Sequence, residues 1–329
     1  MLVRTRYVLV GSALIVVVGL CAGLVAYYNG SLPLRSSTIG PAELAYVPAG
    51  TSGVAYANVR EIMNSEFRRK LQQMLPAGAE KERLLAETGI DIERDLDTVV
   101  AAVGGTDQGA GAIALLRGRF DAARIEAMAV GHGATAETYG GKHVVVFKHG
   151  PTGPGASLAF LEPGLIALGE LAALRLAIDA SATHDSAVRN PELMNLVAHV
   201  DGAGNAWAIG RLDVLADKRL VPDQVRRVLP AVQWLSASFD VGRTVNGRLR
   251  ADTPDQQSGD QLRSVVTGAL AVARVMAGKD ARLDAVLNSI HAGGTGPTVE
   301  VTFSVPPEMV DLISGASGAR GPKVPPPPR

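Results

Sequence analysis

An uncharged apolar run near the N-terminus limits what this chain can fold into more than any other feature. Residues 7–28 read YVLVGSALIVVVGLCAGLVAYY, and no charge occurs over 8–34. About 22 residues at 1.5 Å each give roughly 33 Å, which is long enough for one helix to cross a bilayer. Arg4 and Arg6 precede the run, so the positive-inside rule places residues 1–6 in the cytoplasm.

Two other interpretations of this run are open. A cleaved signal peptide has an apolar core of about 7–15 residues and small residues before the cut, whereas this run is longer and Leu24-Val25-Ala26 is a poor cleavage site. A lipoprotein signal would end at Cys21, but Leu20 stands where a small residue is expected. An uncleaved anchor over 7–28 fits best. It predicts a single-pass protein of the bacterial inner membrane with its folded part in the periplasm.

The composition narrows the possible functions. Lys plus Arg and Asp plus Glu number 32 each, so a zero net charge gives no reason to expect a nucleic-acid partner. The single cysteine, Cys21, lies inside the run, so the rest of the chain has no disulfide, thiol nucleophile or thiolate metal site. Abundant alanine, glycine and valine are typical of a GC-rich bacterial genome.

Residue patterns divide the remaining chain into four parts. A linker over 29–42 is polar and contains Gly, Ser and Pro, and a proline-rich tail over 314–329 is expected to be disordered. Between them, strand-like alternation and helical periodicity follow one another. Asp121 and Asn190 are expected to cap helices, and alternation predicts strands over 232–241, 244–253 and 298–305. The periodicity of the helix over 258–277 places Leu262, Val266, Ala269, Ala273 and Met276 on its inner face. The predicted domains are a first α+β module over 43–200 and a second over 201–313.

The expected fold class is α+β: one transmembrane helix followed by two modules with antiparallel sheets. Each half can be written strand, helix, two strands, helix, strand, which is the split βαβ order of ferredoxin-like units. Residues 53–60 (GVAYANVR) and 205–212 (NAWAIGRL) also share a small–aromatic–small alternation. Two diverged copies of one module and a chance likeness are both open, and duplication requires the same strand order in both halves.

Three segments resemble a group of uncharacterised bacterial membrane-anchored extracytoplasmic proteins with a repeated α+β module. They are ELAYVPAGTSGVAYANVREI, AFLEPGLIALGELAALRLAID and NPELMNLV. The resemblance covers most of 43–313 and rests on turn and packing signals. It implies a fold type and an envelope location, and it implies no active site.

Motifs that carry chemistry are absent from the sequence. The six histidines include no pair at helical spacing four, and no nucleophile elbow or phosphate-binding loop occurs. Asp91, Glu93, Asp95 and Asp97 alternate as in a calcium loop, but Leu96 occupies the position that requires glycine. We therefore predict no catalytic residues, no cofactor and no metal.

One basic cluster, Arg68-Arg69-Lys70, is expected on the outer face of a helix over 61–75. The simpler interpretation is that the cluster keeps this face of the helix solvated. The more specific one is that it contacts lipid head groups, because a short tether would keep this helix near the bilayer.

These features favour a non-catalytic, membrane-anchored envelope protein. Its α+β domain would bind a ligand or an unidentified envelope protein, and its other partner would be the bilayer around 7–28. The alternatives are an envelope enzyme, hydrolase-like, with a site assembled from distant residues, and a structural spacer. The clearest helix is expected over 258–277, and an exposed apolar strip there would count against a spacer because such strips indicate a partner.

Overall fold

The computed structural model describes residues 39–74, 91–104, 111–147, 156–211, 232–277 and 281–306. No helix in these ranges is long and apolar enough to cross a membrane. The predicted anchor over 7–28, most of the linker and the tail over 314–329 lie outside the described residues, so the anchor stays a prediction.

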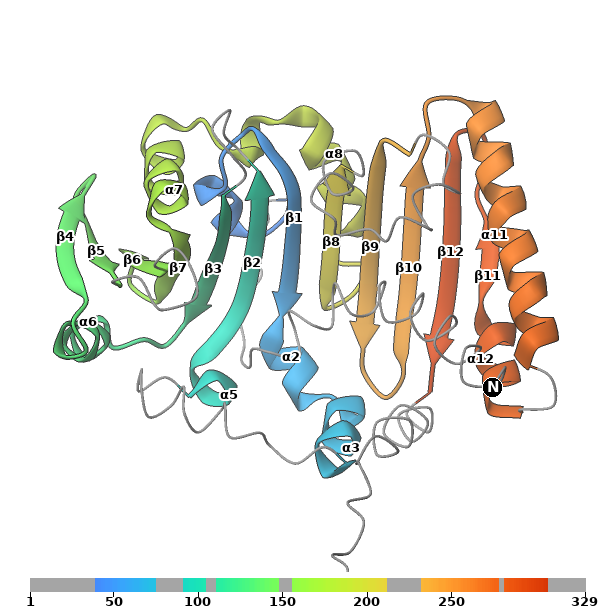
Figure 1. Cartoon of the computed structure of the whole chain (residues 1–329), viewed down its shortest axis with the longest axis horizontal. Coiled ribbons are helices and arrows are strands. Elements are labelled where there is room, and N and C mark those ends of the chain that lie inside the picture. The colour runs from blue at the N-terminus through green and yellow to red at the C-terminus, as the bar shows by residue number, and fades with distance from the viewer. Residues whose placement is uncertain are drawn as a thin grey trace, which may run out of the picture.

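All described strands belong to one twelve-stranded sheet, in which every neighbouring pair is antiparallel (Figure 1). The order across the sheet is β11-β12-β10-β9-β8-β1-β2-β3-β7-β6-β5-β4. The strands are β1 Thr51–Asn58, β2 Leu96–Gly104, β3 Ala112–Gly118, β4 Thr135–Tyr139, β5 Lys142–Val146, β6 Ala156–Glu162, β7 Leu165–Glu170, β8 Ala206–Arg211, β9 Trp234–Val241, β10 Val245–Asp252, β11 His291–Gly293 and β12 Thr298–Val305. The expectation of an α+β fold with antiparallel pairing is confirmed.

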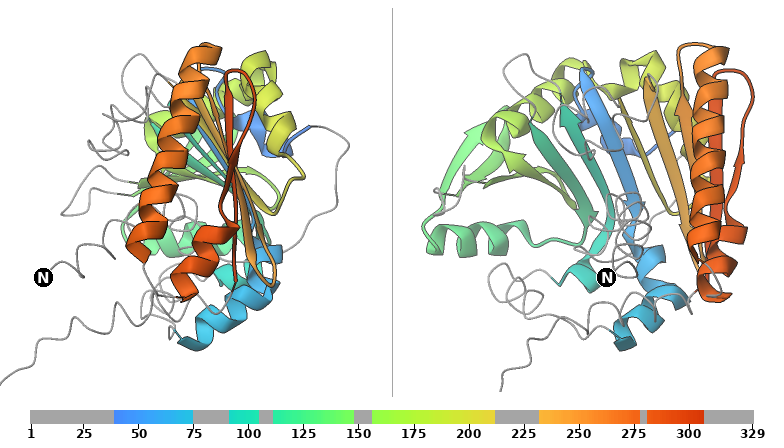
Figure 2. Two further views of the ribbon diagram at one scale, coloured as in Figure 1. Left: turned by 90° about the vertical axis from the view of Figure 1, so that its right-hand side faces the viewer. Right: turned by 45° about the vertical axis from the view of Figure 1, so that its right-hand side comes forward.

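Helices cover both faces of the sheet. One face carries η1 (Ala42–Tyr46), α7 (Leu171–Thr183), η2 (Ala187–Arg189) and α8 (Pro191–Val200), which we call the η1–η2–α8 side. The opposite face carries α2 (Val59–Asn64), α6 (Ala122–Gly131), α11 (Gln256–Ala277) and α12 (Ala281–Ser289). Figure 2 shows α11 and α8 on opposite sides of the sheet. Two short helices, α3 (Glu66–Met74) and α5 (Ile92–Asp95), lie beyond the lower ends of the strands (Figure 1).

The predicted split βαβ order is wrong. A βαβ unit joins parallel strands through a helix that crosses the sheet face, whereas β1 and β2 are antiparallel neighbours although α2 and α3 stand between them in the chain. Because α2 packs at the lower end of one sheet face and α3 lies beyond that end, the chain re-enters the sheet at the end where it left (Figure 1). Periodicity predicts such a helix but does not say whether it crosses the sheet.

A repeated strand order does occur, centred on the β1–β8 pair. Outward from this pair, one half reads β1, β2, β3, β7 and the other reads β8, β9, β10, β12. The two alternating segments noted in the sequence meet across the pair, with Tyr56 opposite Trp207 and their rings stacked at 5.6 Å between centroids. The two predicted modules therefore share a single continuous sheet.

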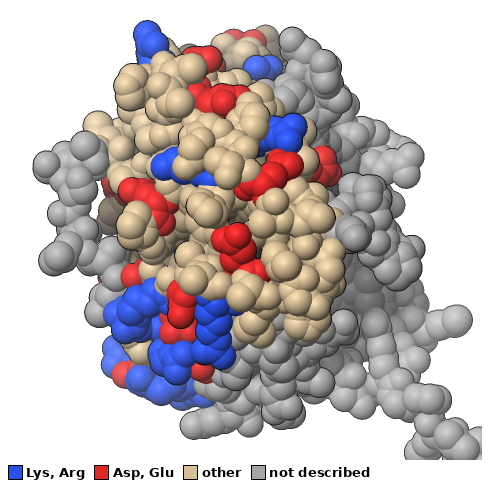
Figure 3. All heavy atoms as spheres, turned by 90° about the vertical axis from the view of Figure 1, so that its left-hand side faces the viewer, with Lys and Arg blue, Asp and Glu red and all other residues tan. Residues whose placement is uncertain are grey.

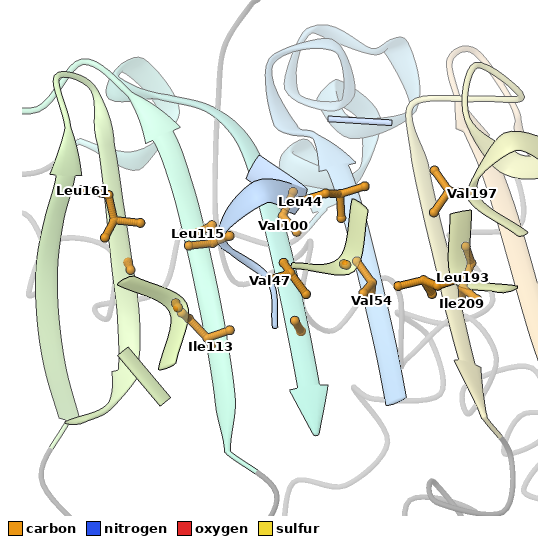
Figure 4. Close-up of a cluster of buried hydrophobic side chains, with 14 of the residues drawn as sticks. Leu44, Val47, Val54, Val100, Ile113, Leu115, Leu161, Leu193, Val197 and Ile209 are labelled. Carbon is orange, nitrogen blue, oxygen red and sulfur yellow. The ribbon is translucent and has the colours of Figure 1, made fainter. Parts of the chain in front are cut away.

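The largest buried cluster lies beneath η1, α7 and α8. Leu44 lies in η1, and Val47 directly follows it. Both side chains point toward Val54, Val100 and Leu115, which belong to three adjacent strands (Figure 4). These five side chains are at most 2% exposed. Burying each one contributes about 1.5–3 kcal/mol, so η1 is held to the sheet mainly by apolar packing.

Local signals placed several helix starts correctly. Asp121 accepts from the backbone N–H of Arg124 at the start of α6, and Asn190 accepts from Leu193 at the start of α8. The helix expected over 61–75 is instead two helices, because Ser65 is extended and its hydroxyl caps the second by accepting from the N–H of Arg68.

Candidate functional site

Helix α11 runs along the edge of the sheet beside β12 and β11 (Figure 1). Its first turn is capped by Asp255, whose carboxylate accepts from the N–H of Ser258 at 2.7 Å. Hydrogen bonds from Ser258 lower the pKa of Asp255. Leu262 is 2% exposed and packs with Val299 of β12, which fixes the inner face of the helix.

Polar contacts fix the ends of α11 to its neighbours. Near the start, the Arg263 guanidinium donates to the carbonyl oxygens of Thr298 and Gly296 at 2.8 and 2.9 Å. Near the end, Arg274 donates to the carbonyl of Leu287 at 3.2 Å. Gly259 has no room for a side chain, because a Cβ there would overlap the Gly296 carbonyl. The helix therefore has one defined rotation about its own axis.

That rotation leaves an apolar strip facing outward on the second half of α11. Val272 and Val275 are 58% and 82% exposed, among the most exposed large apolar side chains described. Gly268 and Ala271 are exposed on the same side. Earlier positions of this side, Gln257, Gln261 and Ser264, are polar. We call Gly268, Ala271, Val272 and Val275 the α11 strip.

The sequence pattern identified the inner face of α11 better than the outer one. Of the residues expected inside, Leu262 is buried and Val266 is half-buried, whereas Ala269 is exposed. The inner-face pattern does not identify the strip, whose own signal is the spacing of 4 and 3 from Gly268 through Val272 to Val275. A run without charge over 264–273 was the available signal, because an amphipathic surface helix normally carries charges on its outer face.

A second group of interest is a partly buried ion-pair cluster at one end of β3. The Arg117 guanidinium bonds to the carboxylates of Glu43, whose side chain is 5% exposed, and of Glu162 at 3.0 Å. Burial acts to lower the pKa of Arg117, but the two carboxylates outweigh it and the pKa is raised. Burial, assisted by Glu162, raises the pKa of Tyr46. Each charge has a partner, so the cluster ties η1 to the sheet and leaves no group poised for proton transfer.

The predicted lipid-facing patch, Arg68, Arg69 and Lys70, lies on α3. Arg68 bonds to Glu93 at 3.3 Å and its side chain is 21% exposed. Arg69 is exposed and donates to the Asn64 carbonyl at 3.1 Å, and Lys70 is exposed. The three side chains do not form one uniform basic surface, because the first is held by an acid of a neighbouring helix. A lipid contact by this patch stays a prediction.

Acidic and basic side chains also form pairs around the neighbouring helices α2 and α5. Arg60 pairs with Asp97, and Arg94 pairs with Asp95 at 2.8 Å. Burial raises the pKa of Asp97 against the opposing effect of Arg60, while the Arg94 hydrogen bond lowers that of Asp95. The molecular face in Figure 3 likewise shows blue and red atoms intermixed, with its largest basic group interrupted by acidic atoms.

The remaining candidate ligands are dispersed. Among the described residues, no three His, Cys, Asp or Glu side chains gather as a metal site would require. Asp91, just before α5, accepts from the N–H of Glu93, and its own N–H donates to the Asp95 carboxylate at the end of that helix. His143 lies 3.4 Å from Glu126, His199 bonds to the Asn195 carbonyl, and His149 lies outside the described residues.

Comparisons with known proteins bear on the fold. No family model matches the chain, and no curated protein matches it. The solved structure of crystal form III of TP0453 is similar over 85% of this chain and 100% of that one, with a TM-score of 0.51 and 10% identity. Crystal form I gives a TM-score of 0.48 at 9% identity. At this identity the likeness shows a shared fold and nothing further.

Proposed function

We propose that this chain is a non-catalytic binding protein anchored in the bacterial inner membrane. Residues 7–28 would form the single membrane-spanning helix, with residues 1–6 in the cytoplasm and the α+β domain in the periplasm. The support for the anchor is the uncharged run itself, which is long enough for a bilayer, and the arginines that precede it.

The observation that carries the binding role is the α11 strip. Outward valines at 58% and 82% exposure lie on a helix whose opposite face is already packed. A spacer would gain nothing from this arrangement, since exposed apolar patches favour association. The strip therefore favours a binding role over a purely structural one.

The chemistry of the strip indicates an apolar helix of another envelope protein as its partner. Gly268 and Ala271 are small, so a neighbouring backbone could approach closely, and the valines at positions 272 and 275 could fit between its side chains. The strip carries no charge that an acidic or basic ligand would need. Arg274 is committed to the Leu287 carbonyl.

Site-specific photocrosslinking in native membranes tests this role. A photoreactive residue at Val275 is expected to give a discrete adduct with a protein, and the same residue at Gln261 is expected to give none. The two positions lie 14 residues apart on one side of one helix and are both exposed, so they form a matched pair. Equal yields from both positions, or no adduct from either, would contradict the proposal. An adduct with a second copy of the chain would identify the partner helix as α11 itself.

The repeated strand order supports a further part of the proposal, which is that the two halves descend from one duplicated module. Both halves contribute four strands in the same order, and the equivalent segments pair with each other at the centre. An independent superposition of β1, β2, β3 and β7 on β8, β9, β10 and β12 should align Tyr56 with Trp207. A different residue at that place would count against duplication.

A further inference from the structure

The chain enters the described fold at a fixed point on the η1–η2–α8 side. Gly40 has a φ of +77°, which favours glycine, and its N–H donates to the Asp201 carboxylate at 3.0 Å. A Cβ on Gly40 would press against Leu44 of η1 and Val197 of α8. Gly40 is therefore packed between these two elements, and the preceding linker must leave from their side of the sheet.

Exposed apolar side chains lie on this same side. Ile39, next to the fixed glycine, is 59% exposed, and Val188 of η2 is 52% exposed. The two short helices are joined directly, because the N–H of Ala187 donates to the carbonyl of Val47 at 2.7 Å. The two short helices thus form one layer, with Val188 on it and Ile39 just before its first residue.

The length of the linker limits which surface can face the membrane. Residues 29–38 separate the proposed anchor from Ile39, and ten residues can span at most about 33–36 Å even when fully extended. The α11 strip lies on the other side of the sheet (Figure 2), on the order of 30 Å away when a helix diameter of about 10–12 Å on each side and a sheet layer of about 10 Å are counted. Turning the strip to the bilayer would require an almost fully extended linker.

We propose that the η1–η2–α8 side faces the bilayer, with Ile39 and Val188 touching its interface, and that the α11 strip faces away from it. This inference rests on the proposed anchor and adds an orientation to it. It also explains how the strip stays accessible to a protein partner while the domain is held close to the membrane.

The contact should depend little on salt. Charged side chains exposed around it have both signs, namely Asp185, Arg189, Glu192 and Asp201. Apolar contacts are not screened, whereas attraction of a basic patch to anionic head groups weakens as salt rises. The salt dependence of membrane contact therefore distinguishes this surface from one centred on Arg68, Arg69 and Lys70.

Lipid quenching of site-specific fluorophores in nanodiscs tests the orientation. The full-length chain with Cys21→Ser receives one new cysteine at Val188, Arg69 or Val275, and each labelled protein is placed in phosphatidylcholine nanodiscs with a head-group nitroxide. Quenching is expected to be several-fold greater at position 188 than at 275, with position 69 not exceeding 188. Raising the salt, or adding phosphatidylserine, should leave this order unchanged.

The possible contrary results are distinct. Greatest quenching at position 275 would overturn the orientation, and greatest quenching at 69 that is lost in high salt would replace it with the basic patch. A chain that does not remain with the nanodiscs would remove the anchor, and the orientation with it. Circular dichroism of each labelled protein verifies that the fold is unchanged, since all three positions are on the surface.

Discussion

The two halves of the sheet share a strand order but differ in how they are covered. In the first half, both faces are covered, and Val100, Leu115 and Ala167 on the η1–η2–α8 side are fully buried. In the second half, that same side of β9, β10 and β12 is mostly polar apart from the buried Trp234 at the start of β9, and α11 packs on the opposite face. The polar side chains there are Ser236, Ser238, Arg248, Arg250, Glu300 and Thr302.

This difference shows that a shared strand order does not imply a shared surface. Side chains alternate between the faces of a strand, so substitutions at every second position can make one face polar without altering the strand order. In the first half, apolar residues lie on both faces of the sheet, and helices cover both faces. In the second half, apolar residues lie mainly on the face that α11 covers, the opposite face is mostly polar, and the α11 strip points outward.

The largest expected effect concerns the junction between the halves. Trp207 is 1% exposed and stacks on Tyr56, so Trp207→Ala should reduce the free energy of unfolding by about 3–5 kcal/mol. Urea unfolding of the chain in mild detergent, followed by circular dichroism, measures it. Tyr56→Phe keeps the ring contact and serves as the control. A loss below about 1 kcal/mol for Trp207→Ala would mean that the junction is not a shared core.

The next effect compares an ion pair from each half. Arg117→Met leaves the buried Glu43 carboxylate without its partner and should cost about 2–4 kcal/mol. Arg248→Met removes a pair with Glu300 in which the side chains are 58% and 36% exposed, and should cost at most about 1 kcal/mol. If both variants lose the same free energy of unfolding in the urea experiment, the two halves do not differ in how deeply their ion pairs are buried.

A pair of glycine substitutions in α11 should act in opposite directions. Gly259→Ala introduces an overlap with the Gly296 carbonyl and should destabilise the chain by about 1–3 kcal/mol. Gly268→Ala meets nothing within 4 Å, and should stabilise the helix by about 0.5–1 kcal/mol because alanine is the better helix former. Thermal unfolding of the two variants decides this, and a destabilising Gly268→Ala would mean that the strip is already in contact.

The smallest expected effect on stability accompanies the largest on binding. Val272→Ser with Val275→Ser removes exposed apolar surface, so the free energy of unfolding should change by no more than about 0.5 kcal/mol. Photocrosslinking from the adjacent exposed Ala271 should nevertheless lose its adduct. If the adduct persists at full yield, the valines do not form the binding surface.

Local chemistry in the sequence predicted most of the individual elements. Capping by Asp121 and Asn190 marks helix starts because an oxygen two or three residues ahead satisfies a free N–H. Alternation marks β9, β10 and β12 because one face of each is apolar. Elements without such a signal are not predicted by the sequence. Among them are η1 and the three-residue β11, which is a strand only because it pairs with β12.

The α11 strip illustrates the limit for the candidate site. An uncharged outer face could be suspected from residues 264–273, but which residues point outward depends on the rotation of the helix. That rotation is decided by Gly259 against Gly296 and by Arg263 on the β12 backbone, contacts between positions more than 30 residues apart.

The sequence alone determined an α+β chain with antiparallel pairing, its helix caps and an apolar run suited to a bilayer, because these follow from the composition and period of neighbouring residues. The tertiary structure decided that one sheet joins both halves, that α2 and α3 do not cross it, and that α11 lies opposite α8. Those outcomes depend on which distant strands bury each other's side chains. Tyr56 and Trp207, about 150 residues apart, meet only because β1 and β8 pair.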